Sequence, residues 1–266
     1  MPVPAPVIGP LLRDWRQRRR LSQLDLACEA DISTRHLSFV ETGRARPSRG
    51  MLMRLLDLLD IPLRERNALL LAAGFAPAYA DGNLLAPAMA AARAAMQMVL
   101  KGHEPYPALA VDRHWNLVAA NAAATRLMQG VAAALLVPPI NVLRINLHPD
   151  GLASRIVNLG EVREHILTRL RRMHAYSGDA VLRALHDELA AYPYAGPGEA
   201  SAESSPNADV VLPVRFRSAA GTLSLFTTIT QFGTPLDVGL SELVLESFYP
   251  ADDASASMLR QMAGQN

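Results

Sequence analysis

Three serine residues, each followed by apolar residues at helical spacing, divide residues 22–58 into short segments. The hydroxyl groups of Ser22, Ser33 and Ser48 can accept a hydrogen bond from a backbone N–H in the first turn of a helix, so serine is a preferred N-cap residue. Gly43 is placed to end the second segment, because glycine readily adopts the backbone conformation that closes a helix. The pattern therefore predicts closely spaced short helices.

The second of these segments, which Ser33 begins and Gly43 ends, has an apolar face and a polar face. In the second segment, three apolar residues are expected to point inward: Ile32, Leu37 and Val40. Four other residues are expected to point outward: Thr34, Arg35, Ser38 and Phe39. With the flanking segments, the pattern predicts five short helices over residues 10–76.

Charge is nearly balanced over the whole chain but is unevenly distributed. The formal net charge of the 266 residues is +1, whereas residues 1–66 contain 12 arginines against 8 acidic residues. A basic segment raises the expectation of a nucleic-acid contact. An ordinary solvated surface remains the alternative, because the asymmetry is small.

Two helices joined by a tight turn can present one of them to the major groove of DNA, which is about 12 Å wide. The side-chain amide of Gln23 can bond a phosphate from the first turn of the first helix, and Arg35 can pair bidentately with guanine. The expected DNA contacts are Gln23, Ser33, Thr34, Arg35, Ser38, Phe39, Arg44 and Arg46.

The stretches "LSQLDLA", "DIS" and "HLSFVETGRARPS", in this order, resemble the Cro/C1-type helix-turn-helix family, also called XRE-like. The resemblance implies the docking geometry of phage repressors of that family. It also implies a structural pair between Arg16 and Glu41. In two places the chain departs from the family pattern: Asp31 replaces a common turn glycine, and Phe39 occupies a position that is more often polar. Phe39 therefore has three open roles, as a base contact, a core residue or a partner contact.

Composition shifts along the chain predict five regions. They are a flexible arm (1–9), a helix-turn-helix domain (10–76), a linker with a connecting helix (77–104), an α+β domain (105–250) and a tail or short helix (251–266). A helix is expected at 86–101, and the Gly-, Ser- and Pro-rich stretch at 195–207 is expected to be a mobile loop.

The α+β region begins with a predicted strand, turn and second strand at residues 107–121. Asn121 is expected to cap a short helix, residues 135–151 to be irregular, and two helices to follow at 154–176 and 178–191. Three strands are then predicted at 210–217, 222–232 and 238–248. This order of elements is that of a PAS-like sensor with an antiparallel sheet.

The segments "HEPYPALAVDRHWNLVAAN", "NVLRINLHPDG" and "GTLSLFTTITQFGTPLDVGLSELVLESFYP" resemble the MmyB-like ligand-binding regulators. With the helix-turn-helix, the resemblance covers nearly the whole chain. It implies a bacterial transcription factor whose PAS-like domain binds a small apolar molecule. The fold class expected is α+β, with an N-terminal all-α five-helix domain before the PAS-like domain.

Alternation in the last strands suggests which side chains face a pocket. Leu243 and Leu245 alternate with Glu242 and Glu246, so the leucines are expected to face inward. A face that mixes apolar residues with threonines suits a ligand pocket, although a filled core without a ligand is the alternative. The ligand-contact candidates are Trp115, Leu143, Arg144, His148, Phe226 and Thr228. Arg144 and His148 are expected either to meet a carboxylate head group or to lie on the surface.

Other classes of site are disfavoured. The chain has no Walker, HExxH or GxSxG pattern, so neither an enzyme nor a resident cofactor is expected. Its histidines lack metal-ligand spacing, so no metal site is expected. The single cysteine, Cys28, allows no internal disulfide and fits a reducing cytoplasm. Neither a signal peptide nor a membrane span is expected.

These features together predict a cytoplasmic, sequence-specific DNA-binding regulator, homodimeric on a pseudo-palindromic double-stranded operator. A small apolar ligand, such as an acyl chain, would tune its DNA affinity. The alternative is a constitutive DNA-binding protein whose C-terminal domain serves only oligomerisation.

Overall fold

The computed structural model describes residues 8–82, 86–194, 212–218, 221–233 and 237–264. The chain divides into two compact units, of which the first comprises residues 1–82, 175–178 and 234–241, and the second the remainder. The loop expected at 195–207 lies outside the described residues, as does the expected arm apart from residues 8 and 9. Those two residues begin the first helix, so the helical part starts earlier than predicted.

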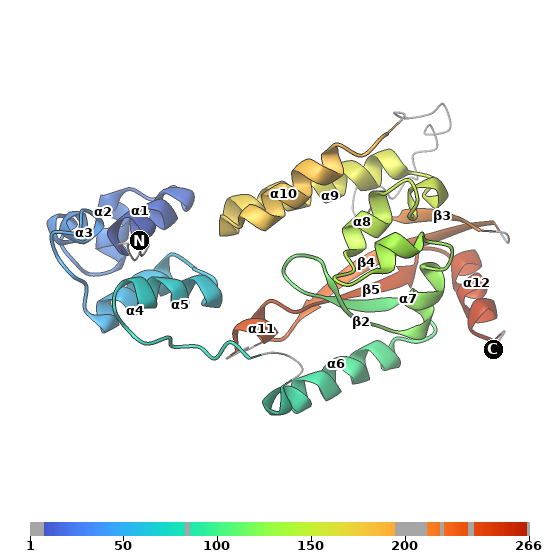
Figure 1. The fold of residues 1–266 in the computed structure, drawn as a ribbon, viewed down its shortest axis with the longest axis horizontal. Coiled ribbons are helices and arrows are strands. Elements are labelled where there is room, and N and C mark those ends of the chain that lie inside the picture. Colours follow the sequence, from blue (N-terminus) through green and yellow to red (C-terminus); the bar gives the residue numbers. More distant parts are fainter. Residues whose placement is uncertain (1–7, 83–85, 195–211, 219–220, 234–236, 265–266) are drawn as a thin grey trace. The chain divides into compact units, whose positions relative to one another are not determined.

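Five short helices build the N-terminal part of the first unit, as expected (Figure 1). They are α1 (Ile8–Arg18), α2 (Gln23–Glu29), α3 (Thr34–Glu41), α4 (Arg49–Leu58) and α5 (Leu63–Ala72). The three serines cap α2, α3 and α4: Ser22 Oγ accepts from Asp25 N at 3.1 Å, Ser33 Oγ from His36 N at 3.2 Å, and Ser48 Oγ from Met51 N at 3.2 Å. These local bonds fix where each helix starts.

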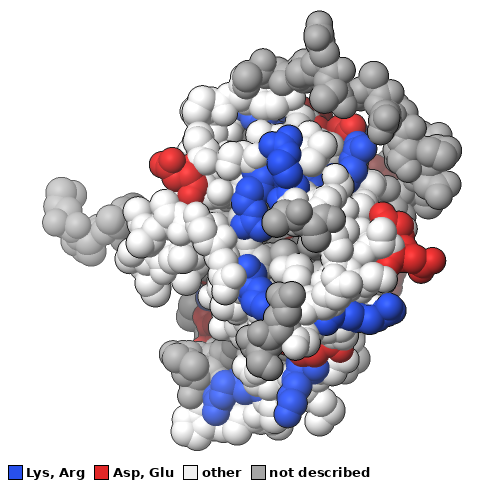
Figure 2. Space-filling model, turned by 90° about the vertical axis from the view of Figure 1, so that its right-hand side faces the viewer, with Lys and Arg blue, Asp and Glu red and all other residues white. Residues whose placement is uncertain are grey.

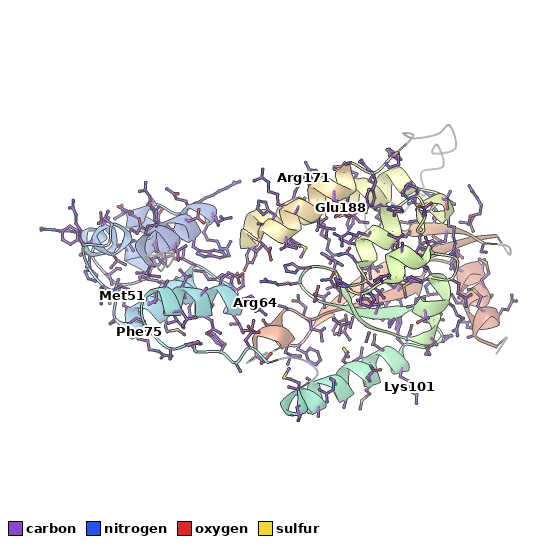
Figure 3. The ribbon with its side chains drawn as sticks, viewed as in Figure 1. Met51, Arg64, Phe75, Lys101, Arg171 and Glu188 are labelled. Atoms are coloured by element: carbon purple, nitrogen blue, oxygen red, sulfur yellow. The ribbon has the colours of Figure 1, made fainter. Side chains whose placement is uncertain are left out.

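A single apolar cluster fills the interior of this helical domain. Leu12, Leu37 and Leu55, from three different helices, are completely buried in it. Met51 of α4 and Phe75, which follows α5, pack against the cluster from its edge (Figure 3). Because these contacts join all the helices, the domain presents α3 on a rigid support.

An antiparallel five-stranded sheet forms the centre of the second unit, with the strand order β2-β1-β5-β4-β3. The strands are β1 (Ala108–Val111), β2 (Leu117–Ala120), β3 (Val214–Ser218), β4 (Gly221–Gln231) and β5 (Val244–Pro250). Every neighbouring pair is antiparallel. The expected α+β class, with an all-α domain before an α+β domain that has an antiparallel sheet, is confirmed.

Helices cover the sheet. They are α6 (Ala90–Gly102), α7 (Ala122–Leu127), α8 (Val142–Leu147), α9 (Leu159–Ser177), α10 (Ala180–Ala190) and α12 (Asp253–Gly264). Short 3-10 turns lie at Pro87–Met89, Ala133–Leu136 and Ala153–Arg155, and α11 is the short helix Val238–Ser241. Figure 1 shows α6 on one side of the sheet and α8 and α9 on the other, so both sheet faces are packed.

Strand register determines which side chains face α8 and α9. Thr227 of β4 is opposite Phe248 of β5, and Glu246 of β5 is opposite Leu109 of β1. Because side chains alternate along a strand, these four side chains share one face of the sheet. That face, together with α7, α8 and α9, borders the cavities described below.

Two predicted elements differ from the structure. The strand expected at 238–248 is instead the short helix α11 followed by β5, which starts at Val244. The stretch expected to be irregular contains α8, whose N-cap is Asn141: its Oδ1 accepts from the backbone N–H groups of Leu143 and Arg144. A helix of six residues is too short to produce a clear periodic signal in sequence.

Candidate nucleic-acid interface and ligand cavity

Helix α3 has one buried edge and one accessible edge. Leu37 and Val40 are completely buried against the helical core, and Ile32, just before the helix, packs against the same core. Arg35 is exposed, and Thr34 and Ser38 are half-buried. The N-terminal turn of α3 therefore presents a polar edge with a guanidinium group at its centre.

A buried ion pair holds the C-terminal end of α3 against α1. Arg16 Nε donates to Glu41 Oε1 at 2.7 Å, and Arg16 Nη2 donates to Glu41 Oε2 at 3.0 Å. Arg16 is 7% exposed and Glu41 4%. The bond to Glu41 raises the pKa of Arg16 above its ordinary value. A bidentate, desolvated pair of this kind fixes orientation strongly, because both groups would be left uncompensated if either moved.

Gln23 joins the same group of side chains. Its Nε2 donates to Glu41 Oε2 at 2.7 Å, so the Gln23 amide is anchored on its nitrogen side. One N–H and the amide oxygen remain available for other partners. Gln23 is the first residue of α2, and its bond to Glu41 of α3 sets the orientation of its side chain. The predicted phosphate contact would therefore come from a side chain that is already ordered.

The sequence left three roles open for Phe39, as a base contact, a core residue or a partner contact, and its position bears on the second. It is half-buried, yet it does not belong to the apolar cluster of the helical domain or to the apolar residues packed against that cluster. The core role is therefore not supported. Arg44 and Arg46, which follow α3, are both exposed, as a pair of phosphate contacts would have to be.

The first cavity, called here the α9 cavity, lies between the sheet and helices α8 and α9. Its volume is about 70 Å³, counted as the space open to the centre of a water molecule. Because one water molecule needs roughly 10–15 Å³ on that measure, the cavity has room for several waters. Its polar lining comes from Asn146, His165, Arg169, Thr227 and Glu246.

The second cavity, called here the α7 cavity, lies between α7, α8 and the sheet and has a volume of about 50 Å³ on the same measure. Its walls are mainly apolar, with Leu127, Met128 and Leu152 among them. The two cavities share four lining residues: Asn146, Phe216, Glu246 and Phe248. They therefore adjoin, and together they form one polar and one apolar compartment.

Glu246 and Arg169 meet at the boundary of these compartments. Arg169 Nη1 lies 3.5 Å from Glu246 Oε1, and the Arg169 guanidinium also stacks over the Trp115 ring at 4.1 Å from its centroid. Burial raises the pKa of Glu246, an effect that the charge of Arg169 offsets only in part. Burial lowers the pKa of Arg169, and the charge of Glu246 and the hydrogen bond to it act in the opposite direction.

The six predicted ligand residues have different positions. Leu143 lines the α9 cavity. Trp115 is 2% exposed and lies beneath Arg169, so it supports the cavity wall without lining either cavity. Its indole Nε1 is buried and has no hydrogen-bond partner among the described residues.

Arg144 and His148 line neither cavity. Arg144 donates from Nε and Nη2 to the two carboxylate oxygens of Glu188, each at 2.7 Å (Glu188 is labelled in Figure 3). His148 meets the Tyr192 ring edge-on, with 5.0 Å between the centroids. These residues tie α8 to α10 and the segment after it, and the structure does not place them where a ligand head group would lie in the cavities.

Phe226 and Thr228 lie on the other face of the sheet, which corrects the prediction. Their neighbour Thr227 lines the α9 cavity, and alternation along β4 turns the two flanking side chains away from it. Phe226 stacks on Tyr249 with 5.4 Å between the ring centroids, and Thr228 is exposed. The predicted face was displaced by one residue, which in a strand reverses every side chain.

Sequence reasoning also missed all five polar residues that line the α9 cavity: Asn146, His165, Arg169, Thr227 and Glu246. The expectation that Glu246 would point away from the core was wrong, because both faces of the sheet are covered. One signal could have identified it. A glutamate in a strand that is mostly apolar and aromatic is costly to bury unless it has a partner, so it marks a candidate for function.

The surface of the second unit is mixed in charge where it can be seen. On the face shown in Figure 2, toward α12 and β3, Lys and Arg side chains lie among Asp and Glu side chains on a largely uncharged surface. In the described residues, no group of three His, Cys, Asp or Glu side chains could hold a metal ion. None of the helices that the structure describes is long and apolar enough to cross a membrane.

Two family models match the chain, one over the N-terminal helices and one over most of the α+β part. A model described as a helix-turn-helix domain matches residues 7–69. A model described as the MmyB-like transcription regulator ligand binding domain matches residues 92–262. No curated protein matches the chain.

Proposed function

We propose a function on the premise that this chain belongs to the helix-turn-helix transcription regulators with an MmyB-like ligand-binding domain. It is a DNA-binding transcription regulator that responds to a ligand. In the form we propose, it acts in the bacterial cytoplasm as a homodimer on a pseudo-palindromic operator. A small apolar molecule, such as one with an acyl chain, binds the second unit and changes the affinity for DNA.

The observation that carries the DNA-binding part is the polar edge of α3. Arg35 is exposed at the first turn of a helix whose other end is fixed by the Arg16–Glu41 pair. A rigid helix with an exposed arginine near its N-terminus suits major-groove reading, because the guanidinium can reach the O6 and N7 atoms of guanine. Arg44 and Arg46 would then contact phosphates, which position the protein without reading sequence.

The dimer is proposed from the size of the reading element. Helix α3 has only eight residues, and a single helix of this kind reads few base pairs. Two copies on half-sites about 34 Å apart would multiply the specificity. The short recognition helix therefore supports a dimer on DNA, whichever surface joins the two protomers.

The ligand part rests on the two adjoining cavities. One is mainly apolar, and the other brings a few polar side chains together, which is the usual character of a small-molecule site. Because the cavities are small, an acyl chain would have to displace side chains as it enters. Such a rearrangement allows ligand binding to favour one protein conformation over another, as any change in DNA affinity requires.

Genome-wide mapping of the DNA bound by the protein tests the DNA-binding part, with Arg35→Ala as the comparison. We expect the wild-type protein to give a shared motif with two-fold symmetry, and the variant to lose that motif. Binding spread over the genome without a motif would contradict sequence-specific recognition, and a single asymmetric motif would contradict the dimer.

Native mass spectrometry of the purified full chain tests the ligand part. A bound mass in the range of an acyl-type molecule, released by denaturation, would support it. If no mass is bound and no apolar compound raises the melting temperature, the second unit serves only oligomerisation, and the protein binds DNA constitutively.

A further inference from the structure

Glu246 occupies an unusual position for a carboxylate. It lies near the middle of β5, is 9% exposed, and lines both cavities at the place where they adjoin. Its neighbours across the sheet are Leu109 on β1 and Ile229 on β4, which offer it no hydrogen bond from their side chains. An isolated carboxylate in such surroundings is costly, so the structure must contain, or must receive, groups that compensate it.

The compensation present in the structure is incomplete. Among the described residues, the side-chain partner of Glu246 is Arg169, with 3.5 Å between Nη1 and Oε1. Charge-assisted N–H···O bonds are usually about 2.7–2.9 Å long. The Arg169 guanidinium is instead held over the Trp115 ring, at 4.1 Å from the centroid. The carboxylate therefore keeps acceptor capacity toward the cavities, and Arg169 keeps N–H donors.

The α9 cavity is lined by one guanidinium group and one carboxyl group, so it has no surplus of basic groups for an anionic ligand. Its titratable side chains are His165 and Arg169 on α9 and Glu246 on β5; α8, β3 and β4 contribute none. Partial desolvation, and then the positive charges of Arg169 and Arg172, lower the pKa of His165 from its ordinary value of 6.5, so it is mainly neutral at neutral pH. An anionic ligand would thus bring a second negative charge to a single guanidinium.

We propose, on the basis of the ligand-binding function proposed above, that Glu246 and Arg169 select a ligand whose head group is uncharged and carries both a hydrogen-bond donor and an acceptor, such as a carboxamide. The head-group N–H donates to Glu246, and the head-group oxygen accepts from Arg169. Glu246 is then a specificity-determining residue, because its negative charge disfavours a free carboxylate at the same place.

The placement of the apolar chain follows from the same geometry. Leu127, Met128 and Leu152 line the α7 cavity, which begins where Glu246 is shared between the two cavities. A molecule with its head group at Glu246 and Arg169 can therefore extend its chain into the apolar compartment. The two adjoining cavities therefore match an amphiphile that has one polar end.

Three probes of equal chain length test this selection: decanamide, decanoic acid and methyl decanoate. Their affinities for the full-length protein are measured at neutral pH by displacement of a fluorescent apolar probe, after removal of any co-purified molecule. We expect decanamide to bind about tenfold or more tightly than decanoate. The ester, which has an acceptor but no donor, should also bind more weakly than the amide.

The variant Glu246→Gln removes the charge and keeps the shape. We expect it to improve the binding of decanoate, so that the amide and the acid come within about threefold of each other. The control is Glu164→Gln, a change at an exposed position of the same helix as Arg169, which should keep the wild-type ratio. Circular dichroism establishes that each variant is folded, and if Glu246→Gln is not, the three wild-type affinities decide alone.

The outcomes separate the two proposals. If decanoate binds the wild-type protein as tightly as decanamide, or if a folded Glu246→Gln variant keeps the wild-type ratio, the proposed selection is wrong while the ligand site stands. If none of the three probes binds, the proposed apolar-ligand site itself is wrong, and the selection fails with it.

Discussion

The guanidinium carbon of Arg35 lies 5.3 Å from the centre of the Phe39 ring, one helical turn farther along α3. A guanidinium within about 6 Å of an aromatic ring is attracted to it, by roughly 0.5–1 kcal/mol at an exposed site. Phe39 is thus placed to restrict the conformations of the residue most suited to reading guanine. This relationship gives the aromatic side chain a role at a position that is more often polar in the resembling family.

Arg35→Ala should lower the affinity for the operator and relax the choice of base at one position in each half-site, by roughly 1–3 kcal/mol. The physical reason is the loss of a bidentate contact to one base pair, with phosphate contacts elsewhere retained. Fluorescence anisotropy with the operator and with single-base variants of it measures both effects. An equal loss on every sequence would show that Arg35 is only a phosphate anchor.

Phe39→Ala provides the companion measurement for that prediction. If Phe39 acts only by positioning Arg35, the double variant Arg35→Ala, Phe39→Ala should bind DNA no worse than Arg35→Ala alone. The contact between the guanidinium and the ring is already absent from the single variant. Strictly additive losses would instead indicate that Phe39 contacts DNA independently of Arg35.

Gln23→Ala should weaken binding to all DNA sequences alike, because the side chain is placed for a phosphate contact. Its amide is held by Glu41 at 2.7 Å, so an ordered group is lost with the substitution. Affinities measured on operator and unrelated DNA should fall by a similar factor. A loss restricted to one base pair would contradict the phosphate role.

The helical domain could be predicted in detail because its signals are local. Ser22, Ser33 and Ser48 each cap a helix through a backbone group three residues away, and such caps can be identified without knowing the rest of the fold. The antiparallel character of the sheet was predictable for a similar reason, from short alternating segments separated by turns.

The cavity could not be predicted to the same extent, because its residues meet over long sequence distances. Arg169 and Glu246 are 77 positions apart, and Arg144 and Glu188 are 44 apart. Nothing in the local pattern tells which arginine has a carboxylate partner. The pattern of β5 also suggested one buried face, whereas packing on both sides buries Glu246 as well as Leu245.

Glu188→Gln should make the second unit less stable near neutral pH and make little difference in acid. Hydrogen bonds from Arg144 lower the pKa of Glu188, despite partial burial, and Tyr192 Oη adds a bond at 2.8 Å. A carboxyl group whose pKa is depressed on folding stabilises the protein above the ordinary glutamate pKa of 4.5, and this stability is lost as the pH falls through the folded value. Because the pair is partly solvated, the effect should be at most about 1 kcal/mol.

Urea denaturation of the wild-type protein and the variant over a series of pH values measures this difference, with Glu164→Gln as a control in a more exposed ion pair. The free energies of unfolding of the wild-type protein and of Glu188→Gln should converge as the solution is acidified. A constant difference at all pH values would show that the variant acts through packing and not through the charge of Glu188.

Gly9→Ala should destabilise the helical domain, although alanine is the better helix former. A Cβ atom at Gly9 would lie 2.5 Å from the carbonyl oxygen of Glu41 and 2.6 Å from that of Val40, so α1 and α3 would have to separate. Helix propensity favours alanine by at most about 1 kcal/mol, whereas forcing atoms into a packed interior costs typically about 1–3 kcal/mol. We therefore expect a lower melting temperature and, because α3 is displaced, weaker DNA binding. Gly50→Ala is the matched control, since among the described residues no heavy atom outside the adjoining turns of α4 lies within 4 Å of its Cβ position. It should leave the protein as stable or slightly more stable. If Gly9→Ala also left stability and DNA binding unchanged, the close approach of α1 to α3 would not be what positions the recognition helix.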